Sequence, residues 1–114
     1  MAATRKVPKV SEACLRGDEA LAHAFSFLGK RWNAVILAVL GAGPTGFRDL
    51  SRTIGRISDS VLSDRLTELA GAGLITRSVE QGPPVSVSYE LTPTGQALMP
   101  ALEQIAQWSG KHLS

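Results

Sequence analysis

Residues 58–91, which read SDSVLSDRLTELAGAGLITRSVEQGPPVSVSYEL, predict a helix, a turn and a two-stranded ribbon in direct succession. On one side of the predicted helix, residues 59–70, three leucines recur at helical spacing: Leu62, Leu66 and Leu69. Ser58 is a suitable N-cap, because its hydroxyl can accept a hydrogen bond from a free backbone N–H of the first turn. Strands are predicted on either side of residues 81–84, where side chains alternate with a period of two. A polar-faced helix followed at once by a hairpin is the outline of a winged helix-turn-helix, so we expect a DNA-binding domain.

Composition limits the other interpretations. With 114 residues, 44% of them hydrophobic, the chain has the size of one domain with a modest core. The net charge of +2 does not identify a nucleic-acid binder, but residues 30–65 hold six Lys and Arg against three Asp. We expect a cytoplasmic protein with no membrane partner, because no apolar run is long enough to span a bilayer and the N-terminus lacks a signal-peptide pattern. The single cysteine, Cys14, excludes an internal disulfide and a cysteine-rich zinc site, and we expect no metal and no cofactor.

The rest of the chain is predicted to be mainly helical. We expect residues 1–13 to form a flexible basic arm, and residues 14–114 to form the DNA-binding and dimerisation domain. Cys14 is expected just ahead of the first helix. Three helices should precede the helix at 59–70, over about residues 18–28, 30–40 and 46–54. The apolar residues at core spacing in the second and third of these are Trp32, Val35, Ile36, Val39, Leu40, Phe47, Leu50 and Ile54.

The last helix is expected over residues 93–108. Thr92 is a natural N-cap, and Pro93 fits the first helical position, where no amide hydrogen is missed. Pro100 should kink or restart the helix, because proline removes an internal hydrogen bond. Glu103 is the only charged residue from 94 to 110, so this helix is expected to pack against a second subunit rather than face water.

In this arrangement the sequence resembles the HxlR-type winged helix-turn-helix regulators, relatives of the MarR group. The motifs that carry the resemblance run in order over residues 14–109: Cys14, Leu28-Gly29-Lys30-Arg31-Trp32, Phe47-Arg48-Asp49-Leu50, residues 57–66, Leu69, Gly73-Leu74-Ile75, and residues 83–95 (PPVSVSYELTPTG). The resemblance implies a mainly α fold with a small antiparallel β-hairpin wing, in a homodimeric bacterial transcription factor that binds inverted repeats. It also implies dimer contacts through the N- and C-terminal helices, where we expect Leu21, Phe25, Leu28, Leu98, Leu102, Ile105 and Trp108.

DNA binding needs phosphate contacts for affinity and a protruding element that reads bases. The candidates for base contacts on the recognition helix, residues 59–70, are Ser58, Ser60, Ser63, Asp64 and Arg65, and Asp59 is a further DNA-binding candidate there. Arg65 could instead reach a phosphate or lie along the protein surface. The candidates for phosphate contacts are Lys30, Arg31, Arg48, Arg52 and Arg56. From the wing, Arg77, Pro83 and Pro84 could reach a minor groove or a sugar-phosphate strand.

The sequence leaves open how the activity of the protein is regulated. Cys14 is either a small buried hydrophobic residue or, given the resemblance, a sensor that is oxidised, alkylated or joined to another thiol. Four aromatic residues could line an effector pocket or simply belong to the core: Phe25, Phe27, Trp32 and Trp108. We expect a repressor rather than an activator. The sequence shows no catalytic constellation, so an enzyme is not expected, and the alternative function is a dimeric interaction module that does not bind DNA.

Overall fold

The computed structural model describes residues 12–113, and side chains from residue 17 onward. The chain divides into two units, residues 1–31 and 32–114, and each is described by itself. The described part of the first unit contains α1 (Glu12–Leu28). The basic arm expected over residues 1–13 lies almost entirely outside the described residues.

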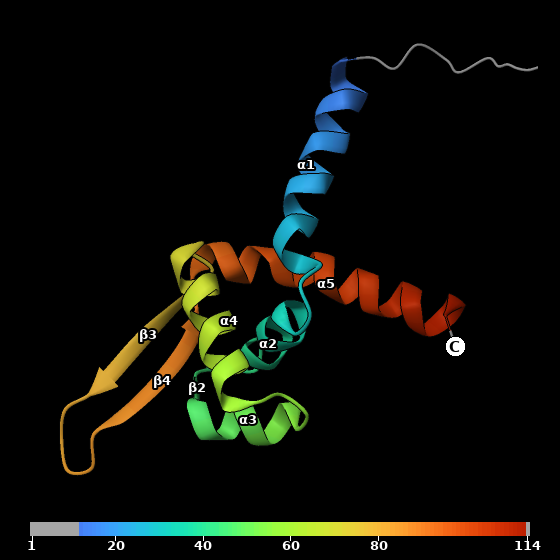
Figure 1. Cartoon of the computed structure of the whole chain (residues 1–114). Coiled ribbons are helices and arrows are strands. Elements are labelled where there is room, and N and C mark those ends of the chain that lie inside the picture. Colours follow the sequence, from blue (N-terminus) through green and yellow to red (C-terminus); the bar gives the residue numbers. More distant parts are fainter. Residues whose placement is uncertain (1–11, 114) are drawn as a thin grey trace, which may run out of the picture. The chain divides into compact units, whose positions relative to one another are not determined.

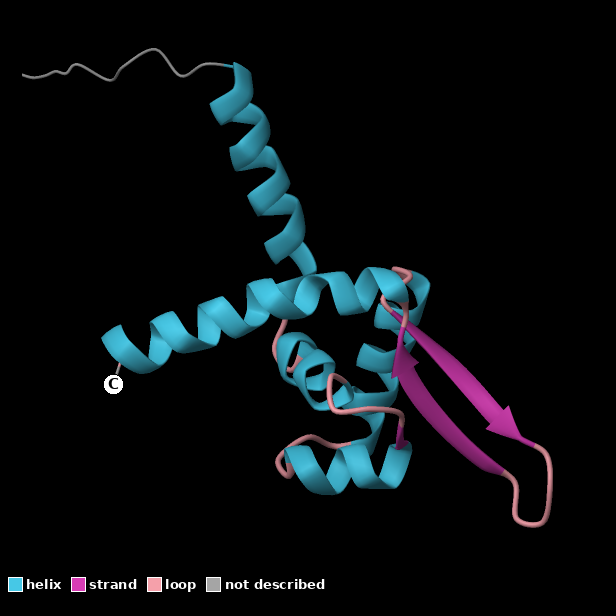
Figure 2. Cartoon of the chain, turned by 180° about the vertical axis from the view of Figure 1, so that it is seen from behind, coloured by secondary structure: helices cyan, strands magenta, loops and turns pink. Residues whose placement is uncertain are grey.

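The second unit has the element order expected of a winged helix. It comprises α2 (Asn33–Leu40), β2 (Thr45–Gly46), α3 (Phe47–Ile54), α4 (Asp59–Gly71), β3 (Ile75–Glu80), β4 (Ser86–Leu91) and α5 (Pro93–His112) (Figure 1). The strands form an antiparallel sheet in the order β2-β4-β3. The β3–β4 hairpin projects away from the helices (Figure 2). The predicted mainly α fold with a β-hairpin wing is therefore confirmed.

The core of this unit is aliphatic and lies where the helices meet the base of the hairpin. Its buried apolar residues are Ile36, Leu37, Leu40, Leu50, Ile57, Leu62, Leu66, Leu69, Leu74, Ile75, Tyr89 and Leu91. The leucine stripe predicted on the recognition helix is thus the buried face of α4. Burial of each such side chain stabilises the fold by about 1.5–3 kcal/mol, so this stripe fixes which face of α4 is left outward.

The hairpin register agrees with the predicted alternation. Ile75 lies opposite Leu91, Arg77 opposite Tyr89, and Val79 opposite Val87, so these side chains share one face of the ribbon. Burial on that face decreases along the ribbon, because its tip extends beyond the helices. The short strand β2 pairs with β4 through Thr45 and Tyr89, and a two-residue strand has too little sequence pattern to be predicted.

The first two helices begin at other residues than predicted. α1 begins at Glu12 rather than Asp18, because the residues before Gly17 are good helix formers and one internal glycine costs only about 1 kcal/mol. Cys14 therefore lies within α1 and not ahead of it. α2 begins at Asn33 rather than Lys30, since Trp32 has a left-handed φ of 85° that a helix cannot contain.

Some predicted core positions are only partly buried. Val35, expected in the core, is 45% exposed, whereas Trp32, Val39, Phe47 and Ile54 are half-buried. A helical stripe is broader than the surface it packs on, so periodicity alone does not separate its centre from its edges.

The last helix is longer than predicted and continues through Pro100 to His112. Pro100 has no N–H for the carbonyl of Gln96, but both residues are exposed, so water can satisfy that oxygen. The predicted N-cap is confirmed, because the backbone N–H of Gly95 donates to Thr92 Oγ1 at 3.1 Å.

Candidate nucleic-acid interface

Helix α4 presents a polar surface that the fold leaves open. The N-cap prediction for Ser58 is confirmed, since the backbone N–H of Val61 donates to its Oγ at 3.2 Å. With the leucine stripe buried, the exposed polar residues of this helix are Asp59, Ser60, Ser63, Asp64 and Thr67. Hydroxyls can donate to or accept from base edges, and a carboxylate can accept from cytosine N4. The exposed face of α4 therefore carries side chains that can form hydrogen bonds with base edges.

The turn that orients α4 is short and well anchored. Gly55 ends α3 with a φ of +90°, a conformation that favours glycine, and Ile57 is buried between the two helices. Arg56 stands exposed between them. This turn holds α3 and α4 in a helix-turn-helix, in which the first helix lies across the DNA backbone when the second enters the major groove.

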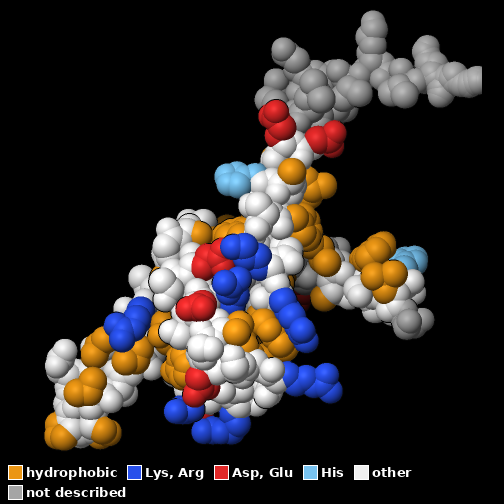
Figure 3. All heavy atoms as spheres, in the orientation of Figure 1, with side chains coloured by type: hydrophobic (Ala, Val, Ile, Leu, Met, Phe, Trp, Pro, Cys, Tyr) orange, Lys and Arg blue, Asp and Glu red, His pale blue; other side chains and the backbone are white. Residues whose placement is uncertain are grey.

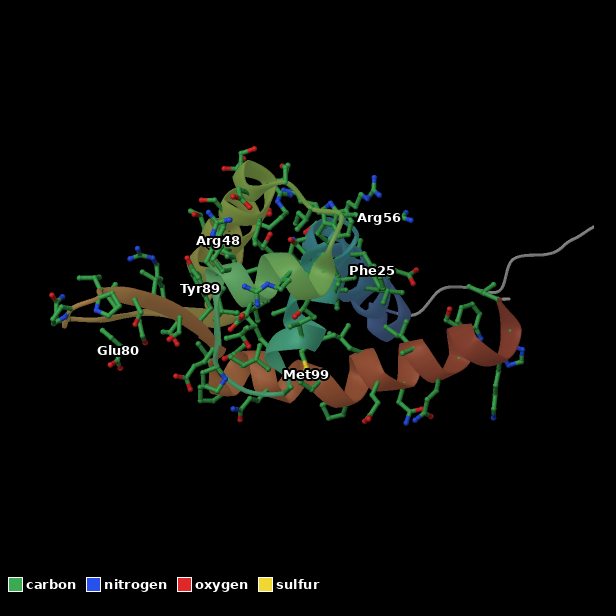
Figure 4. The ribbon with its side chains drawn as sticks, turned by 90° about the horizontal axis from the view of Figure 1, so that it is seen from below. Phe25, Arg48, Arg56, Glu80, Tyr89 and Met99 are labelled. Atoms are coloured by element: carbon green, nitrogen blue, oxygen red, sulfur yellow. The ribbon has the colours of Figure 1, made fainter. Side chains whose placement is uncertain are left out.

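The arginines of α3 both hold carboxylates. Nη1 of Arg48 donates to Oδ2 of Asp59 at 3.0 Å, and Nη1 of Arg52 donates to Oδ1 of Asp49 at 2.9 Å. Basic side chains therefore alternate with acidic ones on this side of the molecule (Figure 3). By contrast, the side chains of Arg56 and Arg77 form no hydrogen bond or ion pair within residues 17–113. Arg48 and Arg56 lie toward opposite ends of α3 (Figure 4).

The remaining predicted cations lie elsewhere. Arg65 is half-buried beside Glu68, with 3.3 Å between Nη1 and Oε1, on the opposite flank of α4 from Asp59. Arg65 therefore does not lie in the outward polar row of α4, which consists of Asp59, Ser60, Ser63, Asp64 and Thr67. Lys30 and Arg31 follow α1 in the unit of residues 1–31, so they are not placed relative to the helix-turn-helix.

The wing is apolar toward its tip. Pro83 and Pro84 are exposed and joined by a cis peptide bond, and the neighbouring Val85 is also exposed. The hairpin carries no Lys or Arg after Arg77, whereas Glu80 and Glu90 are acidic. Arg77, near the base of the hairpin, is therefore the one basic side chain of residues 75–91.

A half-open cavity of about 430 Å³ lies between α4 and the wing, and it was not predicted from the sequence. Its lining residues are Phe47, Ser63, Leu66, Thr67, Ala70, Arg77, Val87 and Tyr89. A signal was present, because the ribbon alternation places Arg77, Val87 and Tyr89 on one face. The sequence does not show, however, which helix that face meets.

The predicted dimer residues occur on both units. In α1, Leu21 and Phe25 are exposed and Leu28 is half-buried. In α5, Ile105 and Trp108 are exposed, whereas Leu98 and Leu102 are half-buried. A groove of about 370 Å³ between α2 and α5 is lined by Ala38, Gly41, Met99, Leu102, Glu103 and Ala106. Each terminal helix thus carries exposed apolar side chains.

Two features are absent from the described part of the chain. Among the described residues, no group of three or more His, Cys, Asp or Glu side chains could hold a metal ion. None of the described helices has the length and apolar character needed to cross a bilayer. The side chain of Cys14 lies outside the described ones.

Comparison with known proteins gives the family. The profile described as HxlR-like helix-turn-helix matches residues 27–114. The chain belongs to this family. The HTH-type transcriptional regulator YodB of Bacillus subtilis is 42% identical over 86 residues, which cover 75% of this chain and 77% of YodB. The structure of reduced YodB has a TM-score of 0.76 and 38% identity, covering 83% of this chain and 93% of YodB. Quinone-bound YodB has a TM-score of 0.71 and 37% identity, over 81% and 96% of the two chains.

This membership confirms the main sequence prediction. An HxlR-like protein with this fold is a DNA-binding transcriptional regulator, and the alternative of an interaction module is not favoured. Families of transcriptional regulators are in general not enzymes. The matched region includes the helix-turn-helix, the wing and α5, whereas Cys14 precedes it.

Proposed function

We propose that this protein acts as a homodimer that binds an inverted-repeat operator and represses transcription. The observation that carries the proposal is the outward polar row of α4, held by a helix-turn-helix beside a projecting hairpin. Two such helices related by a two-fold axis would read half-sites about one helical turn, roughly 34 Å, apart. The proposed activity is therefore binding, not catalysis.

The contacts divide by chemistry. We assign base contacts to Ser60, Ser63 and Asp64 on α4, with Ser58 and Asp59 at its start. Arg56 and Arg77 are the proposed phosphate contacts, because they are exposed and hold no carboxylate within the described side chains. Arg48 and Arg52 lie on the same side, and phosphate must compete with Asp59 and Asp49 for them. Pro83 and Pro84 are proposed to position the wing.

The dimer is proposed to form through α1 and α5. The exposed apolar side chains of these helices support this proposal, because an isolated subunit would leave Leu21, Phe25, Ile105 and Trp108 in water. Within the second unit, the α2–α5 groove widens the apolar surface next to Leu102. A dimer is also what an inverted repeat requires, since each half-site needs one α4.

We propose that a thiol-reactive effector acts at Cys14. It is the only cysteine of the chain, and the relative YodB has been crystallised in reduced, diamide-treated and quinone-bound forms. A change at α1 would be transmitted by altering the distance between the two copies of α4. The other two interpretations, a buried structural Cys14 and an effector pocket lined by aromatic residues, predict regulation that is indifferent to thiol oxidants.

The experiment is a binding assay on labelled genomic DNA around the protein's own gene. The reduced protein is expected to bind with an affinity that falls steeply as salt rises, and a mild thiol oxidant is expected to release it. Cys14→Ser should bind equally well with and without oxidant. Binding by the wild-type protein that oxidation leaves unchanged would refute the sensor, whereas no binding to any fragment at low salt would refute the function.

A further inference from the structure

The carboxylate of Asp59 links the two helices of the helix-turn-helix. Its Oδ2 accepts from Arg48 Nη1 at 3.0 Å, and its Oδ1 accepts from Ser51 Oγ at 3.5 Å. Both donors lie on α3, whereas Asp59 is the first residue of α4. Within the described residues these are the side-chain hydrogen bonds that join α3 to α4. In this structure the side chain of Arg48 thus extends toward the start of α4.

A second carboxylate on the same helix provides a comparison. Asp64 is also exposed on α4, but its side chain forms no hydrogen bond or ion pair within residues 17–113. Each carboxylate would be repelled by a nearby phosphate. Of these two carboxylates, that of Asp59 also forms an ion pair with the guanidinium of Arg48 on α3. The two residues thus carry the same charge, lie on the same helix and are both exposed, but Asp59 is paired with an arginine and Asp64 is not.

Resting on the proposed DNA binding, we propose that Asp59 is a specificity-determining residue, because it holds Arg48 against the first turn of α4. An arginine bound to a carboxylate must give up that partner before it can neutralise a phosphate. It therefore contributes less to counterion release, which supplies essentially all of the affinity for DNA of arbitrary sequence. The ratio of specific to non-specific affinity decides whether a regulator finds its operator. Asp59 thereby lowers the affinity for DNA of arbitrary sequence, which is the denominator of that ratio.

The exposure of the pair is consistent with this role. The side chains of Arg48 and Asp59 are 75% and 55% exposed, so in water the ion pair is weak and easily exchanged. A pair of this kind adds little to folding, but it competes directly with any phosphate that approaches Arg48. Removing the carboxylate should consequently change DNA binding much more than stability.

The test uses a duplex of random sequence and compares Asp59→Asn with Asp64→Asn. Both variants remove one exposed carboxylate from α4, so their difference reports the release of Arg48. One additional phosphate contact steepens the slope of log K against log salt by about 0.9. Between 50 and 200 mM salt, D59N should therefore lose about 3.5-fold more affinity than D64N. Glu90→Gln also removes one exposed carboxylate, but on the face of β4 opposite Tyr89, and it therefore controls for the change in net charge. Equal slopes for D59N and D64N would overturn the proposal.

A double-mutant cycle keeps the test independent of D59N alone. Arg48→Gln should lower the slope by about 0.9 in the D59N protein and by less in the protein that retains Asp59. An equal drop in both backgrounds would show that Arg48 binds phosphate despite Asp59, and would overturn the inference. Thermal denaturation confirms that each variant is folded. If the wild-type protein shows no salt-dependent binding to any duplex, the proposed function fails together with this inference.

Discussion

Gly95 is the point at which α5 touches the chain segment that follows the recognition helix. A Cβ at this position would overlap the carbonyl oxygen of Leu74 and lie 3.2 Å from Cδ2 of Leu91. That carbonyl also accepts from the backbone N–H of Thr92 at 3.0 Å. Gly95→Ala must therefore displace either α5 or the Leu74 carbonyl, and it threatens the hydrogen bond at the start of α5.

The expected change in the free energy of unfolding combines two costs and one gain. Overpacking of a well-filled site costs about 1–3 kcal/mol, and loss of a hydrogen bond costs about 0.5–1.5 kcal/mol. Alanine returns up to about 1 kcal/mol through its higher helix propensity. We expect Gly95→Ala to lower the free energy of unfolding by about 1–3 kcal/mol. Each kcal/mol should lower Tm by about 4–8 °C for a domain of this size.

The assay is thermal and urea denaturation followed by circular dichroism, at equal protein concentration so that any dimerisation contributes equally. Gly110→Ala is the matched control, since it is the same substitution in the same helix and nothing lies within 4 Å of the added Cβ. G110A should be as stable as the wild type or slightly more stable. If G95A were as stable as G110A, the close approach of α5 to Leu74 would be refuted.

Three further predictions address the cap, the phosphate contacts and the dimer. Ser58→Ala should cost about 1 kcal/mol of stability, because the first turn of α4 loses its side-chain acceptor; an unchanged Tm would contradict the cap. Arg56→Ala and Arg77→Ala should each reduce the slope of log K against log salt by about 0.9, and unaltered slopes would remove them from the interface. The double variant Ile105→Glu/Trp108→Glu should sediment as a monomer and lose operator binding, whereas a dimer that persists would exclude this face of α5 from the contact.

The sequence predicted the parts of the fold that depend on local periodicity. The leucine stripe of α4, the caps at Ser58 and Thr92, and the hairpin alternation follow from helical or strand geometry within a few residues. Each was confirmed. Element boundaries were less accurate where the backbone departs from an average preference, as at Trp32, whose left-handed φ delays α2.

What the sequence could not give is the pairing of side chains that lie far apart along the chain. Arg48 and Asp59 are eleven positions apart, and their contact exists only because the turn after Gly55 folds α3 against α4. The cavity between α4 and the wing arises in the same way, from two faces that meet. A list of charged residues on a helix therefore identifies candidates, but it does not show which of them have partners.

The ion pairs between arginines and carboxylates limit how many phosphate contacts one subunit can make. Residues 30–65 hold twice as many cations as acids, yet Arg48, Arg52 and Arg65 each lie beside a carboxylate. With Arg56 and Arg77 as the unpaired arginines among the described side chains of the helix-turn-helix and wing, one subunit offers few strong phosphate contacts. Because counterion release grows with the number of phosphates neutralised, a single copy should bind weakly at physiological salt. Two copies on one duplex double these contacts, and the second binds at a high effective concentration. If the protein binds its operator as the proposed dimer, we expect the paired arginines to make dimerisation a condition for that binding, which would link the apolar face of α5 to the polar face of α4.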